Sequence, residues 1–516
     1  MDIFPSKLAK TFISKKNLKI LFVGSEASPF AKVGGLASVM YSLPKALSLL
    51  GHDARVMLPR YLAIDDETFN LSMEYENLKV PTGNTEGVDH LICNVKKHDP
   101  ARSGKSSEKI GAVVTYFLEN QEYYEQRANV YGYADDPVRF ALLSRGAIEF
   151  IRQSNTWVPD VIVALDWQTG LIPNFLKTVY SRDPILSKIA TVFSIHNLYF
   201  QGVFDHHFVS EMEFDDGHSP IPGFNNPRLS QMNFMRRGIT YSDMINTVSQ
   251  NYAKEIMTKE YGELLDDLLR ERRAVLTGIL NGIDYAVWNP KKDTAVPFPY
   301  DARSLSVRVK NKPILQERLG LAQDDQAFII SIVGRLSKQK GLDLLFNNLN
   351  LLLQELPLQI VIVGEGESDI MGYFHDLETR YPGRVVAHLK YDSVLPHLVF
   401  AGADVVLMPS RFEPCGLIQM EAMRMGCIPI VRKTGGLADS VEDYNPDKQT
   451  GTGFVFERFD SSSLMIALVR AYENFRDKKK WLELQKRAIS KDFSWENSAE
   501  KYMELFNRSI DIHKKL

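Results

Sequence analysis

The sequence predicts an α/β protein made of two doubly wound, Rossmann-like domains that face a cleft. Short apolar runs alternate with amphipathic stretches in both halves of the chain. Nearly the same loop occurs twice, as Lys32-Val-Gly-Gly-Leu36 and as Lys433-Thr-Gly-Gly-Leu437, about 400 residues apart. Alternating strands and helices are typical of parallel sheets with right-handed crossovers and helices on both faces. The repeated loop suggests two related domains that bind one ligand.

In the first half, the continuous apolar run Leu18–Gly24 predicts a buried strand. After the first glycine loop, the helix-spaced apolar residues of Leu36–Leu50 predict a helix that ends at a glycine. Further short apolar runs predict strands at Arg55–Pro59, Val161–Leu165 and Thr191–Ile195.

The second half repeats this scheme more regularly. Strands are expected at Phe328–Gly334, Gln359–Gly364, Val385–Leu389, Val405–Pro409 and Ile428–Val431. Helices are expected between them, at Leu342–Leu356, Asp369–Tyr381, Val394–Gly402 and Leu417–Gly426. The last segment, Phe493–Leu516, has apolar residues at helical spacing and predicts a terminal helix.

These elements give a predicted domain organisation. We expect an N-terminal domain at residues 1–284, which includes the glycine loop 32–36, and a linker at residues 285–300, where prolines and polar residues gather. A C-terminal domain is expected at residues 301–490, followed by a helix at residues 491–516.

Composition excludes several classes of function. The 516 residues are 44% hydrophobic and 24% charged, with a net charge of -3, so no strong field favours nucleic acid or an anionic membrane. No apolar run approaches the ~20 residues of a membrane span. Met1–Lys16 lacks the apolar core of a secretory signal, and the three cysteines have no metal-ligand spacing, which indicates reduced thiols. We expect a soluble, cytoplasmic protein whose oligomeric state the sequence leaves open.

Polar residues follow the ends of the predicted strands, where ligands bind in sheets of this kind. The two glycine loops offer backbone N–H groups to an anion such as a phosphate. Arg335 and Lys340 bracket a turn from which both cations could reach phosphate oxygens, and Glu413 lies at a strand-to-helix turn. The Glu413 carboxylate could meet sugar hydroxyls or positive charge developing at an anomeric carbon, and Glu421 a nucleoside ribose. For any one of these residues alone, a solvated loop is an equally good interpretation.

Several blocks of the sequence resemble those of the bacterial glycogen synthase and plant starch synthase family. They run in order over nearly the whole chain: SEASPFAKVGGLASV, DWQTGL, SIHNLYFQGVF, NTVSQNYAKEI, LNGIDYAVWNP, GRLSKQKGLDLL and MPSRFEPCGLIQMEAMRMGCIPIVRKTGGLADSV. The resemblance implies the GT-B glycosyltransferase fold and a retaining glucosyltransferase. Such an enzyme extends the non-reducing end of an α-1,4-glucan with glucose from ADP-glucose, and requires no metal or other cofactor.

The resemblance also implies roles for individual residues. The resemblance implies three catalytic residues. His196 is expected at the reacting carbon, Glu413 is expected to contact the transferred glucose, and Asp166 is expected at the active site. The donor is expected to be bound by the two glycine loops, by the diphosphate-binding cations and by a contact to the ribose. These residues are Lys32, Gly34 and Gly35 of the first loop, the cations Arg335 and Lys340, Glu421 at the ribose, and Thr434, Gly435 and Gly436 of the second loop. Acceptor contacts are expected from Asn197 and from Tyr131 or Tyr133, although core packing of one tyrosine is an equally good interpretation. Transfer is expected through a short-lived, front-side ion pair, in which the departing diphosphate accepts the acceptor's proton.

Some positions depart from the family pattern. Ser38 stands where the family usually has Asp, and Val163, Leu165 and Gln168 stand where it has histidines. A metal site in Asp205–Pro227 is a weaker alternative, because its spacing fits no standard ligand pattern. UDP-glucose as donor, a phosphorylase of similar fold and a catalytically silent paralogue that binds glucan or nucleotide sugar also stay open.

Overall fold

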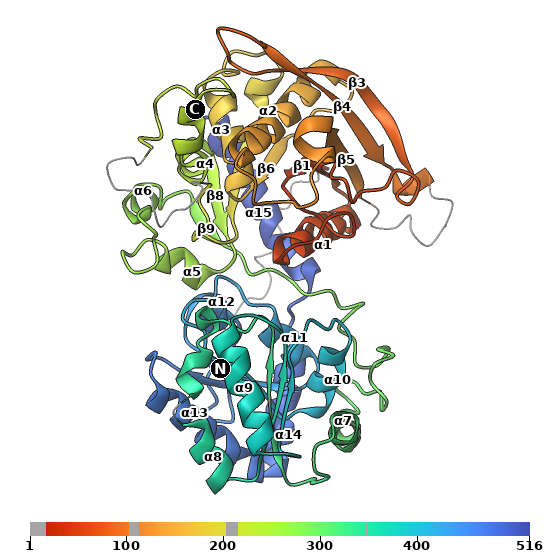
Figure 1. Ribbon diagram of the computed structural model, residues 1–516, viewed down its shortest axis with the longest axis vertical. Coiled ribbons are helices and arrows are strands. Elements are labelled where there is room, and N and C mark those ends of the chain that lie inside the picture. Colours follow the sequence, from red (N-terminus) through yellow and green to blue (C-terminus); the bar gives the residue numbers. More distant parts are fainter. Residues whose placement is uncertain (1–16, 103–112, 203–214, 347, 516) are drawn as a thin grey trace, which may run out of the picture. The chain divides into compact units, whose positions relative to one another are not determined.

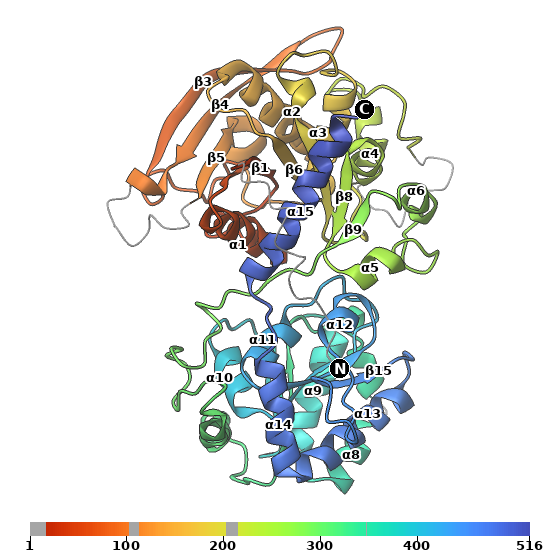
Figure 2. The same cartoon turned by 180° about the vertical axis from the view of Figure 1, so that it is seen from behind.

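The computed structural model describes residues 17–102, 113–202, 215–346 and 348–515. Contacts between residues divide the chain into two compact units. Unit 1 holds residues 1–194, 199–245 and 503–516, and unit 2 holds residues 195–198 and 246–502. The division therefore falls before the predicted linker at 285–300. Residues 503–516, at the blue end of the chain, group with unit 1 (Figures 1 and 2).

A nine-stranded sheet forms the centre of unit 1, in the order β3-β4-β5-β2-β1-β6-β7-β8-β9. Strand β8 crosses the boundary at residue 245, and β9 lies wholly in the part of the chain assigned to unit 2. The strands are β1 (Lys19–Val23), β2 (Asp53–Pro59), β3 (Leu71–Pro81), β4 (His90–His98), β5 (Val114–Glu119), β6 (Val161–Leu165), β7 (Ala190–Ile195), β8 (Met244–Thr247) and β9 (Leu276–Gly278). The helices along this part of the chain are α1 (Gly35–Leu49), α2 (Asp136–Ser154), α3 (Leu171–Lys177), α4 (Phe234–Tyr241), α5 (Gln250–Glu255) and α6 (Asp266–Glu271).

Strands β5, β2, β1, β6 and β7 pair in parallel. Four of them were predicted, whereas β5 was not. The sheet is not parallel throughout, because β3 and β4, which the sequence did not predict, form an antiparallel ribbon on β5. Polar side chains interrupt β3, and Glu76, Asn77 and Lys79 are exposed, so this strand has no continuous apolar run that would reveal it.

Unit 2 contains a six-stranded parallel sheet in the order β12-β11-β10-β13-β14-β15. Its strands are β10 (Phe328–Val333), β11 (Leu358–Val363), β12 (Val385–His388), β13 (Val405–Met408), β14 (Ile428–Arg432) and β15 (Phe454–Phe456). The helices are α7 (Asn311–Leu319), α8 (Leu349–Glu355), α9 (Ser368–Arg380), α10 (Leu395–Gly402), α11 (Ile418–Arg424), α12 (Gly435–Ser440), α13 (Ser461–Arg476) and α14 (Lys478–Ile489). This is the predicted doubly wound arrangement.

Alternate residues of β10 show why helices cover both faces of this sheet. Phe328, Ile330 and Ile332 belong to one buried cluster, and Ile329 belongs to a second. Successive side chains of a strand point to opposite faces, so a strand that is apolar throughout must be buried on both sides. The predicted helix Leu342–Leu356 differs from the structure, which has a 3-10 turn at Leu342–Leu345 followed by α8.

The last helix, α15 (Trp495–His513), ends in unit 1. Phe506 packs edge-on against Phe22 of β1, with ring centroids 6.3 Å apart. His513 Nδ1 lies 3.0 Å from Asp243 Oδ2, and its Nε2 lies 2.9 Å from the Ser187 carbonyl oxygen. The C-terminal turns are therefore held by both apolar and polar contacts.

Among the helices of the described residues, none combines the length and the apolar character that a membrane span requires.

Candidate active site

The first glycine loop connects β1 to α1 and is held by a buried carboxylate. Glu26 is 4% exposed. Its Oε2 accepts hydrogen bonds from the Val33 and Gly34 backbone N–H groups, at 2.6 and 2.8 Å. The Gly34 N–H that the sequence assigned to an anion is therefore bonded to the protein's own carboxylate. Lys32 and Gly35 are exposed, and a Cβ added at Gly35 would meet no atom within 4 Å.

The two tyrosines predicted for the acceptor have different surroundings. The Tyr131 hydroxyl lies 2.8 Å from Ser25 Oγ and donates to Glu26 Oε1 at 3.3 Å, so Tyr131 supports the first glycine loop. Burial raises its pKa well above the ordinary value for tyrosine. The Tyr133 ring instead contacts the guanidinium groups of Arg127 and Arg139, at 4.9 and 4.8 Å from the ring centroid. These contacts favour a packing role for Tyr133.

Asp166 follows β6 with an unusual backbone conformation, φ 54° and ψ -174°. Few residues other than glycine adopt this region, and strain of this kind gathers at functional sites. The Asp166 N–H donates to the Ser194 carbonyl oxygen at 2.9 Å, which ties the end of β6 to the end of β7. The strain is a signal that the sequence does not show.

His196 and Asn197 come directly after β7 and are both half-buried. Burial lowers the pKa of His196 to about 4. The imidazole is therefore neutral near pH 7. A neutral ring with its adjoining main chain offers hydrogen bonds at this position but no positive charge.

In unit 2 the structure brings together two residues that the sequence assigned to different parts of the donor. Lys340 ends the 3-10 turn Lys338–Lys340 after β10, and Glu413 follows β13. Lys340 Nζ lies 2.5 Å from Glu413 Oε2, which also accepts from Ser410 Oγ at 3.1 Å. The predicted diphosphate cation and the predicted sugar carboxylate thus form an ion pair at the carboxyl edge of the sheet.

Arg335 follows the end of β10 and is exposed. The backbone on either side of it is fixed by glycines. Gly364 has φ 150°, and a Cβ added there would lie 1.9 Å from the Gly334 carbonyl oxygen. The Leu336 N–H donates to the Glu365 carbonyl oxygen at 2.9 Å. Arg335 therefore presents a long cationic side chain from a rigid backbone.

The second glycine loop packs against the backbone of Glu413. Gly436 N–H donates to the Glu413 and Pro414 carbonyl oxygens, at 3.0 and 3.1 Å. Gly435 has φ 43°, and a Cβ on it would lie 1.9 Å from the Glu413 carbonyl oxygen. The loop thus supports Glu413. Lys433 of this loop is exposed, like Lys32, and pairs with Glu457 at 2.7 Å.

Glu421 and Cys415 follow Glu413 in the chain. Glu421 lies in the first turn of α11 and is half-buried, and its role toward a ribose stays a prediction. Cys415 is a free, buried thiol, as are Cys93 and Cys427. Burial raises the pKa of each thiol to about 12, so all three are protonated near pH 7.

A carboxylate that sequence reasoning missed lies against the second glycine loop. Glu255, the last residue of α5, accepts hydrogen bonds from the Gly435 N–H and from Thr434 Oγ1, at 2.9 and 3.1 Å. Both partners belong to the same unit as Glu255. The sequence carries no signal of this contact, because Glu255 and Gly435 are 180 positions apart.

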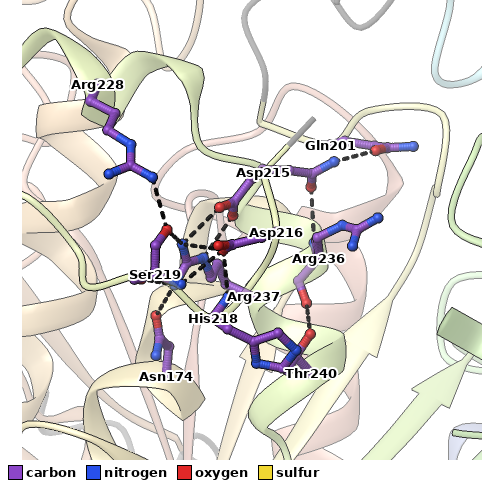
Figure 3. A network of polar contacts seen from close by, with 11 residues as sticks. Asn174, Gln201, Asp215, Asp216, His218, Ser219, Arg228, Arg236, Arg237 and Thr240 are labelled. Carbon is purple, nitrogen blue, oxygen red and sulfur yellow. Dashed lines mark hydrogen bonds and ion pairs between the residues drawn. The ribbon is translucent and has the colours of Figure 1, made fainter. Parts of the chain in front are cut away.

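In the described part of the segment considered as an alternative metal site, residues 215–219 have other partners (Figure 3). The Arg237 guanidinium of α4 donates to both carboxylate oxygens of Asp215, at 2.6 and 2.7 Å, and to the Ser219 carbonyl oxygen at 2.7 Å. Asp216 caps the N–H groups of His218 and Ser219. These contacts anchor residues 215–219 to α4. Within the described residues, no group of three or more His, Cys, Asp or Glu side chains could hold a metal ion. His206 and His207 lie outside the described residues.

Two family models match the chain. Residues 19–271 match the model described as starch synthase catalytic domain, and residues 315–489 match the model described as glycosyl transferases group 1. Glycogen synthase from Clostridium perfringens is 42% identical over 495 residues, which cover 96% of this chain and 99% of the relative. Glycogen synthase from Thermotoga maritima is 40% identical over 494 residues, with the same coverage of 96% and 99%.

Solved structures agree with these matches. The catalytic domain of starch synthase IV from Arabidopsis thaliana, bound to ADP and acarbose, superposes with a TM-score of 0.81 and is 31% identical. The match covers 96% of this chain and 100% of that one. Sucrose-phosphate synthase from Thermosynechococcus elongatus has a TM-score of 0.54 at 16% identity over 95% and 98% of the two chains, and shows the fold alone. The predicted resemblance and fold class are confirmed, and the chain belongs to the glycogen and starch synthase family of GT-B glycosyltransferases.

Proposed function

We propose that this protein transfers glucose from ADP-glucose to the non-reducing end of an α-1,4-glucan, with retention of the anomeric configuration. The observation that carries the proposal is the pairing of Lys340 with Glu413 at 2.5 Å, at the carboxyl ends of parallel strands. Ligands bind at this edge in doubly wound sheets. The pair joins a cation suited to a diphosphate with a carboxylate suited to a sugar.

The proposed role of the cations is to stabilise the departing diphosphate. Negative charge grows on the leaving oxygen as the glycosidic bond to the nucleotide breaks, and fixed cations aimed at that oxygen lower the barrier. Arg335 and Lys340 lie on the turn after β10, with Arg335 exposed and Lys340 only half-buried. On donor binding, the Lys340 ammonium exchanges part of its interaction with Glu413 for phosphate oxygens. The Lys32 side chain is proposed to supply a further cation.

Glu413 is proposed to bind the transferred glucose. Its carboxylate is held by Lys340 and Ser410, and its backbone is held by the second glycine loop, so its position is fixed before any substrate arrives. A positioned carboxylate can accept hydrogen bonds from sugar hydroxyls and favour the positive charge of an oxocarbenium-like transition state. Glu421 completes the proposed donor set. Thr434, Gly435 and Gly436, which the resemblance assigned to the donor, bond Glu255 and the Glu413 backbone instead, so their proposed role is to support Glu413.

Asp166, His196 and Asn197 follow strands β6 and β7, and we assign them to the reacting carbon and the acceptor. With its pKa lowered to about 4, His196 acts as a neutral hydrogen-bonding group. Proton transfer from the acceptor hydroxyl is therefore assigned to the departing diphosphate. The proposal requires no metal ion.

ADP-glucose is preferred over UDP-glucose because the starch synthase structure similar to this chain is bound to ADP. The test is incorporation of radiolabelled glucose into glycogen from each donor in parallel, with the anomer of the product determined. Transfer from ADP-glucose into α-1,4 linkages supports the proposal. Transfer from UDP-glucose alone would assign the other donor, and binding of ADP without transfer from either donor would identify a silent paralogue.

A further inference from the structure

Glu255 makes a concentrated set of contacts with the start of α12, all within unit 2. Its Oε1 lies 2.9 Å from the Gly435 nitrogen, and its Oε2 lies 3.1 Å from the same nitrogen. Thr434 Oγ1 donates to Oε1 at 3.1 Å. Thr434 and Gly435 are both buried. The carboxylate thus binds two consecutive residues of the second glycine loop.

The contact is one half of a reciprocal arrangement between two short helices. Asp439 of α12 accepts a hydrogen bond from the Asn251 backbone N–H, at the start of α5, at 2.7 Å. The Asn251 side-chain amide in turn donates to Glu255 Oε1 at 2.8 Å. Each helix therefore has an N–H group of its first turn bonded to a carboxylate of the other helix, which fixes α5 and α12 relative to each other.

Gly435 passes this constraint on to Glu413. The Gly435 backbone lies so close to the Glu413 carbonyl that an added Cβ would be 1.9 Å from the oxygen. Gly436 N–H donates to the same carbonyl oxygen at 3.0 Å. Two backbones in direct contact have no flexible side chain between them that could absorb a shift. A displacement of Gly435 must therefore move Glu413.

We propose that Glu255 is a positioning residue for glucosyl transfer. Its carboxylate holds Thr434 and Gly435 in place, and through them it holds the Glu413 backbone where the Glu413 side chain meets Lys340 and the transferred sugar. The inference rests on the function proposed above. Glu255 itself needs no contact with donor or acceptor in this role.

The protonation state of Glu255 gives the inference a second readout. Burial raises the pKa of Glu255, while the hydrogen bonds from Gly435, Thr434 and Asn251 and the nearby Arg432 oppose that rise. Asp439, the other carboxylate of the arrangement, bonds the Asn251 backbone N–H. As pH falls through the pKa of Glu255, protonation weakens the carboxylate as an acceptor. A variant with an amide at this position lacks that titration.

The test uses the full chain with Glu255→Ala and Glu255→Gln. Glu271→Ala serves as a matched control, because Glu271 is an exposed residue at the end of α6 that also loses one negative charge. We expect Glu255→Ala to lower kcat about 10- to 100-fold, since small misplacements of reacting groups cost that much, and to change KM for ADP-glucose less than about threefold. Glu255→Gln should lose less, and its deficit relative to the wild type should shrink as the assay pH is lowered. Glu271→Ala should retain wild-type kcat.

Hydrogen exchange separates failure of this inference from failure of the proposed function. Amide exchange in residues 434–437 should be faster in Glu255→Ala than in the wild type, whether or not the protein turns over ADP-glucose. Wild-type kcat in Glu255→Ala, a loss confined to KM or unchanged exchange in residues 434–437 would each overturn the positioning role. A wild-type protein without transfer would overturn the proposed function instead, and faster exchange in Glu255→Ala would then still support the structural link. Should Glu255→Ala fail to fold, Glu255→Gln carries the same comparison.

Discussion

Lys340 and Glu413 neutralise each other at the carboxyl edge of the unit 2 sheet, with 2.5 Å between Nζ and Oε2. Their side chains are 28% and 8% exposed, respectively, so the carboxylate is largely removed from water while the ammonium is not. Removing either member leaves the other charge without its partner, and the cost is greater for the more buried group. Variants of the two residues should therefore behave differently.

Replacement of Glu413 should abolish transfer. Glu413→Ala removes the carboxylate proposed to bind the transferred glucose, and we expect kcat to fall by at least about 100- to 1,000-fold, the usual loss for a group that stabilises charge in the transition state. Affinity for ADP, measured by calorimetry, should change less than about threefold, because the cations of the donor site stay in place. An active Glu413→Ala protein would contradict the role assigned to Glu413.

Replacement of Lys340 should act mainly on turnover. Lys340→Ala removes one cation from the proposed leaving group and leaves Glu413 without its partner, so kcat in steady-state assays should fall about 100-fold. Lys338→Ala is the matched control, because Lys338 lies on the same turn, is 59% exposed and pairs with Asp369 at 3.0 Å. It should keep kcat within about twofold. An effect of Lys340→Ala on glucan affinity alone would refute the diphosphate assignment.

The backbone at Asp166 should store strain that a glycine releases. Asp166 has φ 54° and ψ -174°, a conformation that glycine adopts at little cost. Asp166→Gly should therefore raise the melting temperature. The same substitution removes the proposed catalytic carboxylate. We expect a gain of about 1 kcal/mol in the free energy of unfolding together with a loss of activity. Asp166→Asn should lose activity without the gain in stability, and a less stable Asp166→Gly would argue against backbone strain.

The end of α15 should make stability depend on pH. The hydrogen bond with Asp243 raises the pKa of His513, against the opposing effects of burial and of Lys177, which pairs with Asp243 at 2.8 Å. A histidine whose pKa is raised on folding stabilises the folded protein. This contribution is complete at pH values below the ordinary pKa of about 6.5, and it is lost as pH rises through the folded-state pKa. His513→Gln should therefore cost about 1 kcal/mol near pH 5.5 and much less near pH 9. Melting curves of both proteins at the two pH values check this, and an equal loss at both would exclude the titration.

The sequence predicted most of the buried parallel strands, because each of these is mainly apolar, but it did not predict β5 or β15. The run that contains Ile329, Ile330 and Ile332 has to be covered on both faces, and few other environments suit such a run. It did not predict β3 and β4, in which polar side chains interrupt the apolar ones. Nor did it predict the break in the helix after Leu345.

In the candidate site, the sequence motifs identified several residues, but the contacts between those residues are seen only in the structure. The order of motifs identified Lys340 and Glu413, and the structure added their direct pairing. The carboxylates Glu26 and Glu255, which hold the two glycine loops, were not predicted as ligands of those loops. Contacts of this kind depend on how elements distant in the chain meet, and no local periodicity encodes them.

The three buried thiols give each unit its own reporter of local opening. Cys93 lies in unit 1, whereas Cys415 and Cys427 lie in unit 2. With pKa values raised to about 12, these thiols become reactive toward an alkylating reagent only when the surrounding structure opens. Rates of alkylation, resolved by peptide mass spectrometry, would therefore measure the opening free energies of the two units side by side in one unmodified chain.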